Sequence, residues 1–399
     1  MGNTSTTKMQ QIFSQFESNL WTWSLFIGAF SLLLTWGAAR ALEWAWFRPR
    51  RLERVLREQG LRGTVYRPLV GDFKENTQLN KEACAKPMPL SHDIIPRVEP
   101  LLHRSMKEFG KQSFTWFGSL PRVTIRDPEL VREILSSKFG HFETQKIGRL
   151  GRLLADGGLI MYDGEKWAKH RRILNPAFHV EKLKRMLPAF ATCCDELVDR
   201  WENSVGPDGS FELDVWPEMK ILTGDVISRA AFGSSYQEGR RIFELQSELA
   251  ERFTKTIPTS FLPFSWYLPT ENNRRMKQMS REVHTLLKGI IAKREKAIQN
   301  GETTKDDLLG LLLESNMREM GQNGKSDSSL GMTTNEVIEE CKVFYIAGKG
   351  TTSVLLTWTM VVLSMHPEWQ EKVREEVLQH FGRKTPDYDG LSRLKIVSY

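Results

Sequence analysis

The most constraining feature of the sequence is a run of 20 residues without a charged side chain, Leu20 to Ala39 (LWTWSLFIGAFSLLLTWGAA). At 1.5 Å per residue, a helix of this length spans about 30 Å, the thickness of the hydrocarbon core of a bilayer. Trp21, Trp23 and Trp36 lie near its ends, where indole rings favour the membrane interface. No clear small-residue cleavage site follows, so the run predicts an uncleaved signal anchor, with a cleaved signal peptide as the alternative.

Flanking charges predict the orientation of this anchor. Lys8 and Glu17 are the charged residues before it, and six arginines follow it: Arg40, Arg48, Arg50, Arg51, Arg54 and Arg57. Because basic residues near a span favour the cytoplasmic side, we expect the chain to cross the membrane once, with its C-terminal flank in the cytoplasm. Residues 1–19 then form a short lumenal tail, 20–39 the anchor and 40–62 a basic, amphipathic linker. The bulk of the chain is expected in the cytoplasm, on the endoplasmic reticulum membrane.

Composition narrows the class of partner. The chain has 399 residues, 40% of them hydrophobic, and a formal net charge of +7. It has no zinc-finger spacing, aromatic RNA-binding box or long basic block, so we predict no nucleic-acid partner. A basic surface that faces anionic lipid or an acidic protein fits the same charge. Its four cysteines form neither a CxxC pair nor a regular framework, which indicates a reducing compartment.

From residue 63 onward the pattern predicts a mainly α-helical domain with a small β-sheet region. The stretch FTWFGSLPRVTIRD, residues 114–127, is typical of a hairpin, and Asp127 with Pro128 favours a helix start directly after it. A helix of about 30 residues is expected to begin at Thr333, which forms a capping-box signature with Glu336. Pro367 ends this helix and begins another.

Polar and small residues interrupt the middle of the long apolar helix. Gly348 and Gly350 lie there beside Thr351 and Thr352. A glycine inside a helix costs about 1 kcal/mol relative to alanine. The pair either permits close packing against another helix or forms a notch that admits a flat group. A threonine hydroxyl at such a notch can bond back to a helix carbonyl or bind a ligand.

Two motifs favour the notch, because both resemble those of the cytochrome P-450 haem-thiolate monooxygenases. The residues from Ala347 to Thr352 (AGKGTT) resemble the family's A-G-x-[D/E]-T-T motif, and Trp167 with Arg171 resembles its W-x-x-x-R helix. Their i, i+4 spacing puts Trp167 and Arg171 on one helix face, where arginine can bind a carboxylate bidentately. The phrases LREQGLRGTVYRPLVGD, GLIMYDGEKWAKHRRILNPAFH and DDLLGLLLESN look like the plant 72A-type subfamily. The resemblance covers essentially the whole chain.

The resemblance implies a fold, a chemistry and a set of site residues. It implies haem as cofactor, electrons from NADPH through a membrane-bound NADPH-cytochrome reductase, and hydroxylation of small lipophilic molecules such as the terpenoids of plant specialised metabolism. Thr351 is then the catalytic, oxygen-side hydroxyl, and Ala347, Gly348 and Thr352 lie against the haem. Trp167 and Arg171 bind the haem propionates. Residues 256–270 resemble the membrane-facing region over the substrate channel, although an ordinary apolar loop is the alternative.

Two departures from the family pattern change the expected activity. Gly350 stands at the acidic position of A-G-x-[D/E]-T-T, which should slow proton delivery and weaken the helix locally. The family's haem loop, F-x-x-G-x-R-x-C-x-G, is absent, so no cysteine of this sequence is an expected iron ligand. Residues 63–399 are therefore expected to be a truncated monooxygenase domain that neither binds haem stably nor hydroxylates a substrate.

Two alternatives to an inactive fragment remain open at the level of the sequence. The chain could be a membrane-bound pseudoenzyme that engages the reductase or a full-length partner, although no sequence feature favours that role. Its C-terminus could also reflect a gene model that ends early. The sequence does not identify a substrate or a site of hydroxylation.

Overall fold

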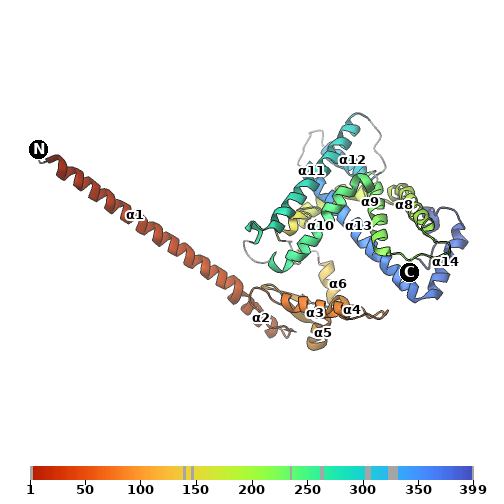
Figure 1. Cartoon of the computed structure of the whole chain (residues 1–399), viewed down its shortest axis with the longest axis horizontal. Helices are drawn as coiled ribbons and strands as arrows, with labels where there is room; N and C mark the ends of the chain where they lie inside the picture. The colour runs from red at the N-terminus through yellow and green to blue at the C-terminus, as the bar shows by residue number, and fades with distance from the viewer. Residues whose placement is uncertain are drawn as a thin grey trace. The chain divides into compact units, whose positions relative to one another are not determined.

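The computed structural model describes residues 3–137, 141–144, 148–233, 236–260, 265–301, 307–321 and 331–397 (Figure 1). The chain forms two compact units, Met1–Ser136 and Ser137–Tyr399, each of which is described by itself. Helices predominate in both units, and one small sheet lies in the first. The predicted fold class, mainly α with a small β-sheet region, is confirmed.

The first unit begins with a long helix and contains the sheet. Its elements in chain order are α1 (Asn3–Leu42), the π-helical turn η1 (Glu43–Phe47), α2 (Arg48–Glu58), β1 (Arg62–Gly63), α3 (Phe73–Ala85), α4 (Ile95–Val98), α5 (Pro100–Phe109), β2 (Ser113–Phe117), β3 (Leu120–Thr124) and α6 (Pro128–Ser136). Strand β2 pairs in parallel with β1 and antiparallel with β3, with Ser113 opposite Thr124. The predicted hairpin is therefore confirmed, and α6 begins at Pro128 as expected.

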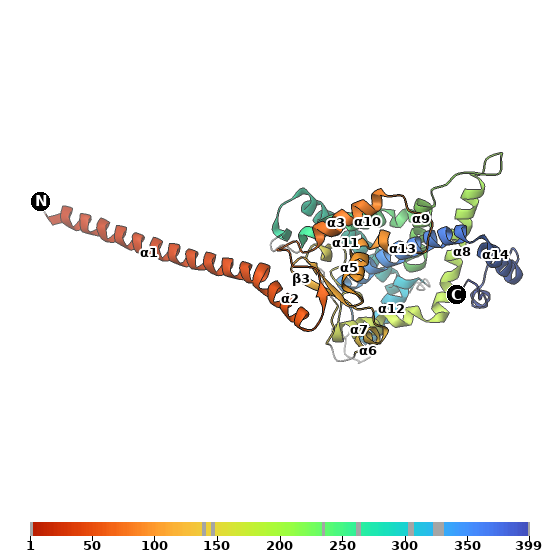
Figure 2. The same cartoon turned by 90° about the horizontal axis from the view of Figure 1, so that it is seen from below.

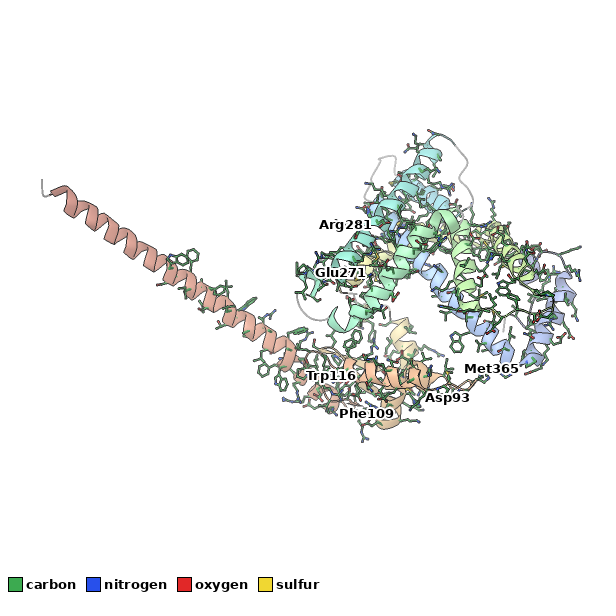
Figure 3. The ribbon with its side chains drawn as sticks, viewed as in Figure 1. Asp93, Phe109, Trp116, Glu271, Arg281 and Met365 are labelled. Atoms are coloured by element: carbon green, nitrogen blue, oxygen red, sulfur yellow. The ribbon has the colours of Figure 1, made fainter. Side chains whose placement is uncertain are left out.

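A small aromatic core holds the sheet of this unit together. Tyr66, Phe114 and Trp116 are buried against one another, with the rings of Tyr66 and Trp116 4.7 Å apart. Figure 3 labels Trp116 in this unit. The buried carboxylate of Asp72 accepts hydrogen bonds from the Trp116 backbone N–H at 2.7 Å and the Thr64 hydroxyl at 2.6 Å. Both bonds go to Oδ2 of this carboxylate, whereas Oδ1 has no hydrogen-bond partner within the described residues and lies 3.8 Å from the Arg67 guanidinium.

The N-terminal helix is longer than the predicted anchor. It begins at Asn3, so residues expected as a lumenal tail are helical, and it runs through the whole span of residues 20–39 (Figure 1). The described side chains from Trp23 to Leu42 are all exposed. Among the residues that the structure describes, two helices are long and apolar enough to cross a membrane: Trp23–Glu58 and Thr334–Met365.

The second unit is helical in its described part. Its elements are η2 (Gly151–Leu153), α7 (Gly164–Leu174), η3 (Asn175–Phe178), α8 (Val180–Glu202), α9 (Val215–Phe232), α10 (Tyr236–Ser260), η4 (Ser265–Tyr267), α11 (Glu271–Gln299), α12 (Leu308–Gly321), α13 (Thr334–Met365), α14 (Pro367–Phe381) and α15 (Tyr388–Leu391). Its core is formed by α7 to α13. Residues 261–264, inside the segment expected to lie over a substrate channel, are outside the described residues.

The central helix of this unit is α13, which packs along α9 (Figure 2). Thr333 and Glu336 form the predicted capping box, and α14 begins at Pro367. The first half of α13 is buried, whereas its second half, which ends at Met365 (Figure 3), exposes a row of large apolar side chains: Val354, Leu355, Trp358, Met360 and Val362. The helix continues without interruption through both glycines, and the local weakening expected at Gly350 stays a prediction.

Candidate functional site

The two glycines of α13 have different surroundings. A Cβ atom added to Gly348 would lie 2.6 Å from Cδ1 of Ile227 on α9, closer than two carbon atoms approach. The same atom added to Gly350 would meet nothing within 4 Å. Close helix packing, one of the two interpretations of the sequence, therefore explains Gly348. It does not explain Gly350, which is exposed.

Two threonine hydroxyl groups donate hydrogen bonds to backbone carbonyls of α13 next to these glycines. Thr351 Oγ1 donates a hydrogen bond of 2.6 Å to the carbonyl of Ala347 one turn earlier. From the neighbouring helix, Thr223 Oγ1 donates to the carbonyl of Lys349 at 3.1 Å. The Thr351 side chain thus bonds back to its own helix, as the sequence allowed. Thr351 and Thr352 are both exposed, and Ala347 is half-buried.

The tryptophan and arginine of the predicted propionate site lie one turn apart on α7. Both side chains are exposed. Within the described part of the chain, no hydrogen bond or ion pair uses the Arg171 guanidinium or the Trp167 indole N–H. The adjacent Arg172, in contrast, forms an ion pair of 3.3 Å with Glu319 on α12. Arg171 is therefore available for an anionic group that this part of the chain does not itself supply.

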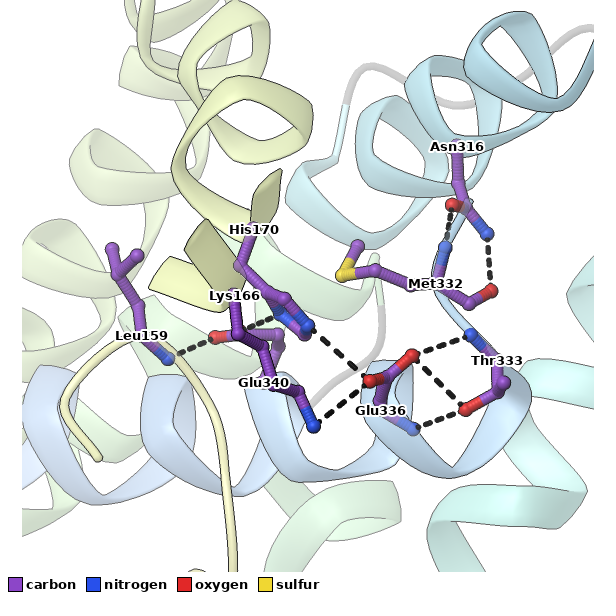
Figure 4. A network of polar contacts seen from close by, with 8 residues as sticks. All are labelled: Leu159, Lys166, His170, Asn316, Met332, Thr333, Glu336 and Glu340. Atoms are coloured by element: carbon purple, nitrogen blue, oxygen red, sulfur yellow. Dashed lines mark hydrogen bonds and ion pairs between the residues drawn. The ribbon is translucent and has the colours of Figure 1, made fainter. Parts of the chain in front are cut away.

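A buried polar network joins α7 to the first half of α13 (Figure 4). His170 Nδ1 and Glu340 Oε1 are 2.7 Å apart, and both side chains are fully buried. The second carboxylate oxygen of Glu340 accepts the backbone N–H of Leu159 at 3.1 Å. Next to this pair, Glu336 Oε1 lies 3.1 Å from Lys166 Nζ and 3.6 Å from His170 Nε2. The network therefore connects two turns of α7 to two turns of α13.

The Glu336 carboxylate and the Lys166 ammonium compensate each other's charge in this network. Burial alone would raise the pKa of Glu336, but the Thr333 backbone N–H and the Lys166 ammonium outweigh burial and hold this pKa at about 2. The pKa of Lys166 is raised: its burial acts in the opposite direction, but Glu336 and Tyr162 stabilise the ammonium. Lys166 Nζ also lies 4.1 Å from the centre of the Tyr162 ring. Glu336 and Lys166 are thus both held in their charged forms.

A neighbouring set of contacts ties the loop before α7 to the same stretch of α13. The backbone N–H of Asp156 donates to Glu339 Oε2 at 2.7 Å, and Lys342 Nζ lies 2.7 Å from Glu339 Oε1. Sequence reasoning missed these residues and the network beside them. The available signal was a group of charged residues, Glu336, Glu339, Glu340 and Lys342, on an otherwise apolar helix. Its partner on α7 could not be identified, because His170 is 170 positions away from Glu340.

The network fixes how α7 presents Trp167 and Arg171. Lys166 and His170 each directly precede one member of that pair, so the two faces differ by about 100° around the helix. One face is docked on α13, and the adjoining face carries Trp167 and Arg171 exposed. Thr351 lies 11 residues after Glu340, about 16 Å further along α13. Helix α7 therefore presents an exposed tryptophan–arginine pair and is bound by polar contacts to α13, which carries Thr351.

The cysteines of the second unit are poor candidates for a metal-ligating thiolate. Burial, followed by the nearby Asp225 carboxylate, raises the pKa of the Cys193 thiol to about 12. Burial also raises the pKa values of Cys341, which is fully buried, and of Cys194. A thiolate ligand needs the opposite environment, in which cationic groups or a metal lower the pKa. These three thiols therefore remain protonated at neutral pH.

The described residues suit the propionate and the ring of a haem, but not its iron. The unpaired Arg171 guanidinium with the Trp167 indole suits a propionate, which accepts hydrogen bonds. The exposed apolar row that continues from Thr351 to Leu355 and Trp358 suits a flat, apolar ring. The iron has no suitable partner among the thiols of α8 and α13, since their raised pKa values keep them protonated; Cys193 and Cys341 are also buried, whereas Cys194 is exposed.

Comparison with known proteins gives consistent matches. Residues 97–398 match the family profile described as cytochrome P-450. The chain is 56% identical over 377 residues to the cytochrome P-450 CYP72A616 of Paris polyphylla, with 93% of this chain and 72% of that protein covered. It is 50% identical over 376 residues to 72A15 of Arabidopsis thaliana, covering 94% and 72%. It is also 48% identical over 372 residues to secologanin synthase 2 of Catharanthus roseus, covering 92% and 70%.

Proposed function

Because this chain belongs to the cytochrome P-450 family, in its plant 72A subfamily, we propose that its second unit carries the oxygen-side and propionate-side residues of a haem-dependent monooxygenase site. The observation that carries this proposal is the exposed Trp167–Arg171 pair, without a partner in the described chain, on a helix docked to α13. When bound, haem supplies the activation of dioxygen and the transfer of one oxygen atom to a C–H bond. The substrate is a small lipophilic molecule of the terpenoid type, and electrons come from NADPH through a reductase at the endoplasmic reticulum membrane.

In that site, residues of this chain would bind the haem propionate, leave room for the ring and place hydroxyl groups on the oxygen side. Arg171 pairs with a propionate, and Trp167 donates its indole N–H to the same edge. Ala347 and Gly348 carry at most one side-chain carbon, so that turn of α13 stays narrow beside the ring. The Thr351 hydroxyl, which donates its own hydrogen bond to the Ala347 carbonyl, accepts a hydrogen bond through its oxygen lone pairs on the oxygen side. Thr352 adds a second exposed hydroxyl at the same turn.

We further propose that a polypeptide of these 399 residues does not hydroxylate by itself. Thiolate ligation is the source of the electron donation that favours O–O cleavage in this family. The printed sequence lacks the F-x-x-G-x-R-x-C-x-G loop, and the Cys193, Cys194 and Cys341 thiols are held protonated. Gly350 also leaves the family's acidic position without a carboxylate, so proton delivery depends on Thr351 and water.

The test is a titration of the full chain with haemin in phosphatidylcholine nanodiscs, followed by the reduced carbon-monoxide difference spectrum. We expect haemin to bind without the Soret band of thiolate ligation. Arg171→Gln should weaken haemin binding roughly tenfold, the usual cost of a lost hydrogen bond to a charged group. Arg172→Gln is the matched control, because its exposed pair with Glu319 contributes little.

Two results would contradict the proposal. Equal haemin affinity in Arg171→Gln and Arg172→Gln would remove Arg171 from the propionate site. A thiolate-type Soret band from the 399-residue chain would show that one of its cysteines ligates iron after all. Reductase that co-purifies with a chain lacking that band would favour the pseudoenzyme instead.

A further inference from the structure

A pocket lies beside the middle of α13. Its volume is about 240 Å³, and it is bounded by α9, α10 and α13. Lys349 and Ser353, which line it, are each two residues from Thr351, or about 200° around the helix, and Gly350 and Val354 extend the lining toward the exposed face. Thr351, Leu355 and Trp358 are not among the lining residues. Its size suits a molecule smaller than most drug-like ligands.

Most of the wall of this pocket is apolar. Trp216 of α9, Phe243 and Ala250 of α10, and Ile346 and Val354 of α13 contribute to it. A wall of this kind favours a ligand with an apolar body over a small, strongly hydrated ion such as free phosphate.

Two buried polar side chains line the pocket without a hydrogen-bond partner. Gln246 of α10 is 5% exposed, and neither its amide nitrogen nor its amide oxygen has a partner within the described chain. Tyr345 of α13 is 1% exposed, and its hydroxyl lacks a partner in the same sense. Buried polar groups are normally satisfied, because an unpaired one costs free energy. The Gln246 amide N–H is a donor for an acceptor group in this pocket, whereas the Tyr345 hydroxyl lies beside Gly239, outside the lining.

Two ammonium groups belong to the same pocket. Lys220 Nζ lies 5.1 Å from the centre of the Trp216 ring, and Lys349 Nζ lies 4.9 Å from that of Phe243. Burial lowers the pKa of Lys349, and the positive charge of Lys220 lowers it further, while Glu244 acts in the opposite direction. Glu244 is itself neutralised by Arg240 at 2.9 Å. An anion between the two lysines would relieve their repulsion.

We propose that this pocket binds a small organic carboxylate with an apolar body. The carboxylate lies between Lys220 and Lys349 and accepts a hydrogen bond from the Gln246 amide N–H. The apolar body lies against Trp216 and Phe243. The two lysines repel a cation. A neutral analogue of the carboxylate lacks the charge that they attract. This site requires neither haem nor a reductase. A negative result for it therefore leaves the proposed monooxygenase site untouched, and a negative result there leaves this site untouched.

The experiment is ¹⁹F NMR of 4-fluorobenzoate with the full chain in phosphatidylcholine nanodiscs, with empty nanodiscs subtracted. We expect saturable line broadening for 4-fluorobenzoate and none for the isosteric, neutral 4-fluorobenzamide. Lys349→Met and Gln246→Leu should each weaken binding roughly tenfold, since each removes a hydrogen bond to a charged group. Lys288→Met, which removes an exposed lysine of α11, is the matched control and should bind as the parent does.

The proposal is overturned if 4-fluorobenzamide binds as well as 4-fluorobenzoate, or if neither shows saturable broadening, in which case the pocket holds water only. It is also overturned if Lys349→Met and Lys288→Met bind equally. Thermal unfolding by circular dichroism checks that each variant is folded. Should Lys349→Met not fold, Lys220→Glu replaces it, because this half-buried residue can change sign and should abolish carboxylate binding.

Discussion

At the scale of single residues, the glycines of α13 look equivalent in the sequence but are not equivalent in the structure. Gly348 lies where α9 approaches so closely that Ile227 occupies the space of a side chain. Gly350 faces open space, so packing does not require a glycine there. The cost of glycine in a helix is thus offset by close packing at one position and not at the other.

This difference predicts opposite effects for one substitution. Gly350→Ala should stabilise the folded chain by about 1 kcal/mol, because alanine loses less conformational freedom in a helix. Gly348→Ala should destabilise it by about 1–3 kcal/mol, because the added methyl group overpacks the contact with Ile227. Chemical unfolding of the full chain in nanodiscs, followed by circular dichroism, measures both. A shift in the same direction for both variants would contradict this account of the two glycines.

At the scale of elements, α7 and α13 are joined by a buried polar contact as well as by apolar packing. The His170–Glu340 pair is inaccessible to solvent, and Glu340 is held further by the Leu159 N–H. The loss of one partner of a buried hydrogen bond is costly, because the other is left unsatisfied. We expect this contact to favour one alignment of α7 on α13, and therefore one placement of Trp167 and Arg171.

A double-mutant cycle tests the pair. His170→Leu leaves the Glu340 carboxyl group buried without its histidine partner and should destabilise the unit by about 1–3 kcal/mol. The double variant with Glu340→Leu should recover a large part of that loss, because neither member of the buried pair remains unsatisfied. The free energies of unfolding of the parent, the two single variants and the double variant complete the cycle. Strict additivity would mean that the two side chains do not interact energetically.

At the scale of the whole molecule, two helices satisfy the length and hydropathy of a membrane span, but their surroundings differ. The described part of α1 exposes every side chain from Trp23 to Leu42. In contrast, α13 buries its first half, including Glu340 and Lys342, in contacts with other parts of its own unit. Charged side chains paired within the protein do not suit a lipid-facing helix. We therefore predict that α1, rather than α13, attaches the chain to a membrane.

Removal of residues 1–42 tests this assignment. The full chain should stay with membranes after an alkaline carbonate wash and should float with them in a density gradient. The shortened chain should leave the membrane fraction, because the apolar surface of α1 supplies the attachment. Flotation separates attachment from aggregation, since aggregates sediment. Shortened chain that still floats would mean that α13 or another segment also inserts.

Local patterns of the sequence predicted much of this structure. The capping box of Thr333 with Glu336, the hairpin of β2 and β3, and the helix start at Pro367 all depend on residues within a few positions of one another. The family resemblance, which rested on short motifs and phrases, is confirmed by the family profile and by relatives about half identical to this chain. The roles of Trp167, Arg171, Ala347, Gly348, Thr351 and Thr352 toward haem stay predictions.

The sequence by itself determined the helical class, the N-terminal apolar helix, the caps and the family, because backbone propensity and side-chain period act over short separations. The tertiary structure alone decided the rest: which glycine is packed, that His170 meets Glu340, that the thiols of α8 and α13 stay protonated, and that Gln246 and Tyr345 line one pocket. Each of these depends on burial or on a partner from a distant helix. The free energy of a polar group is set by what surrounds it after packing, and no local pattern specifies those surroundings.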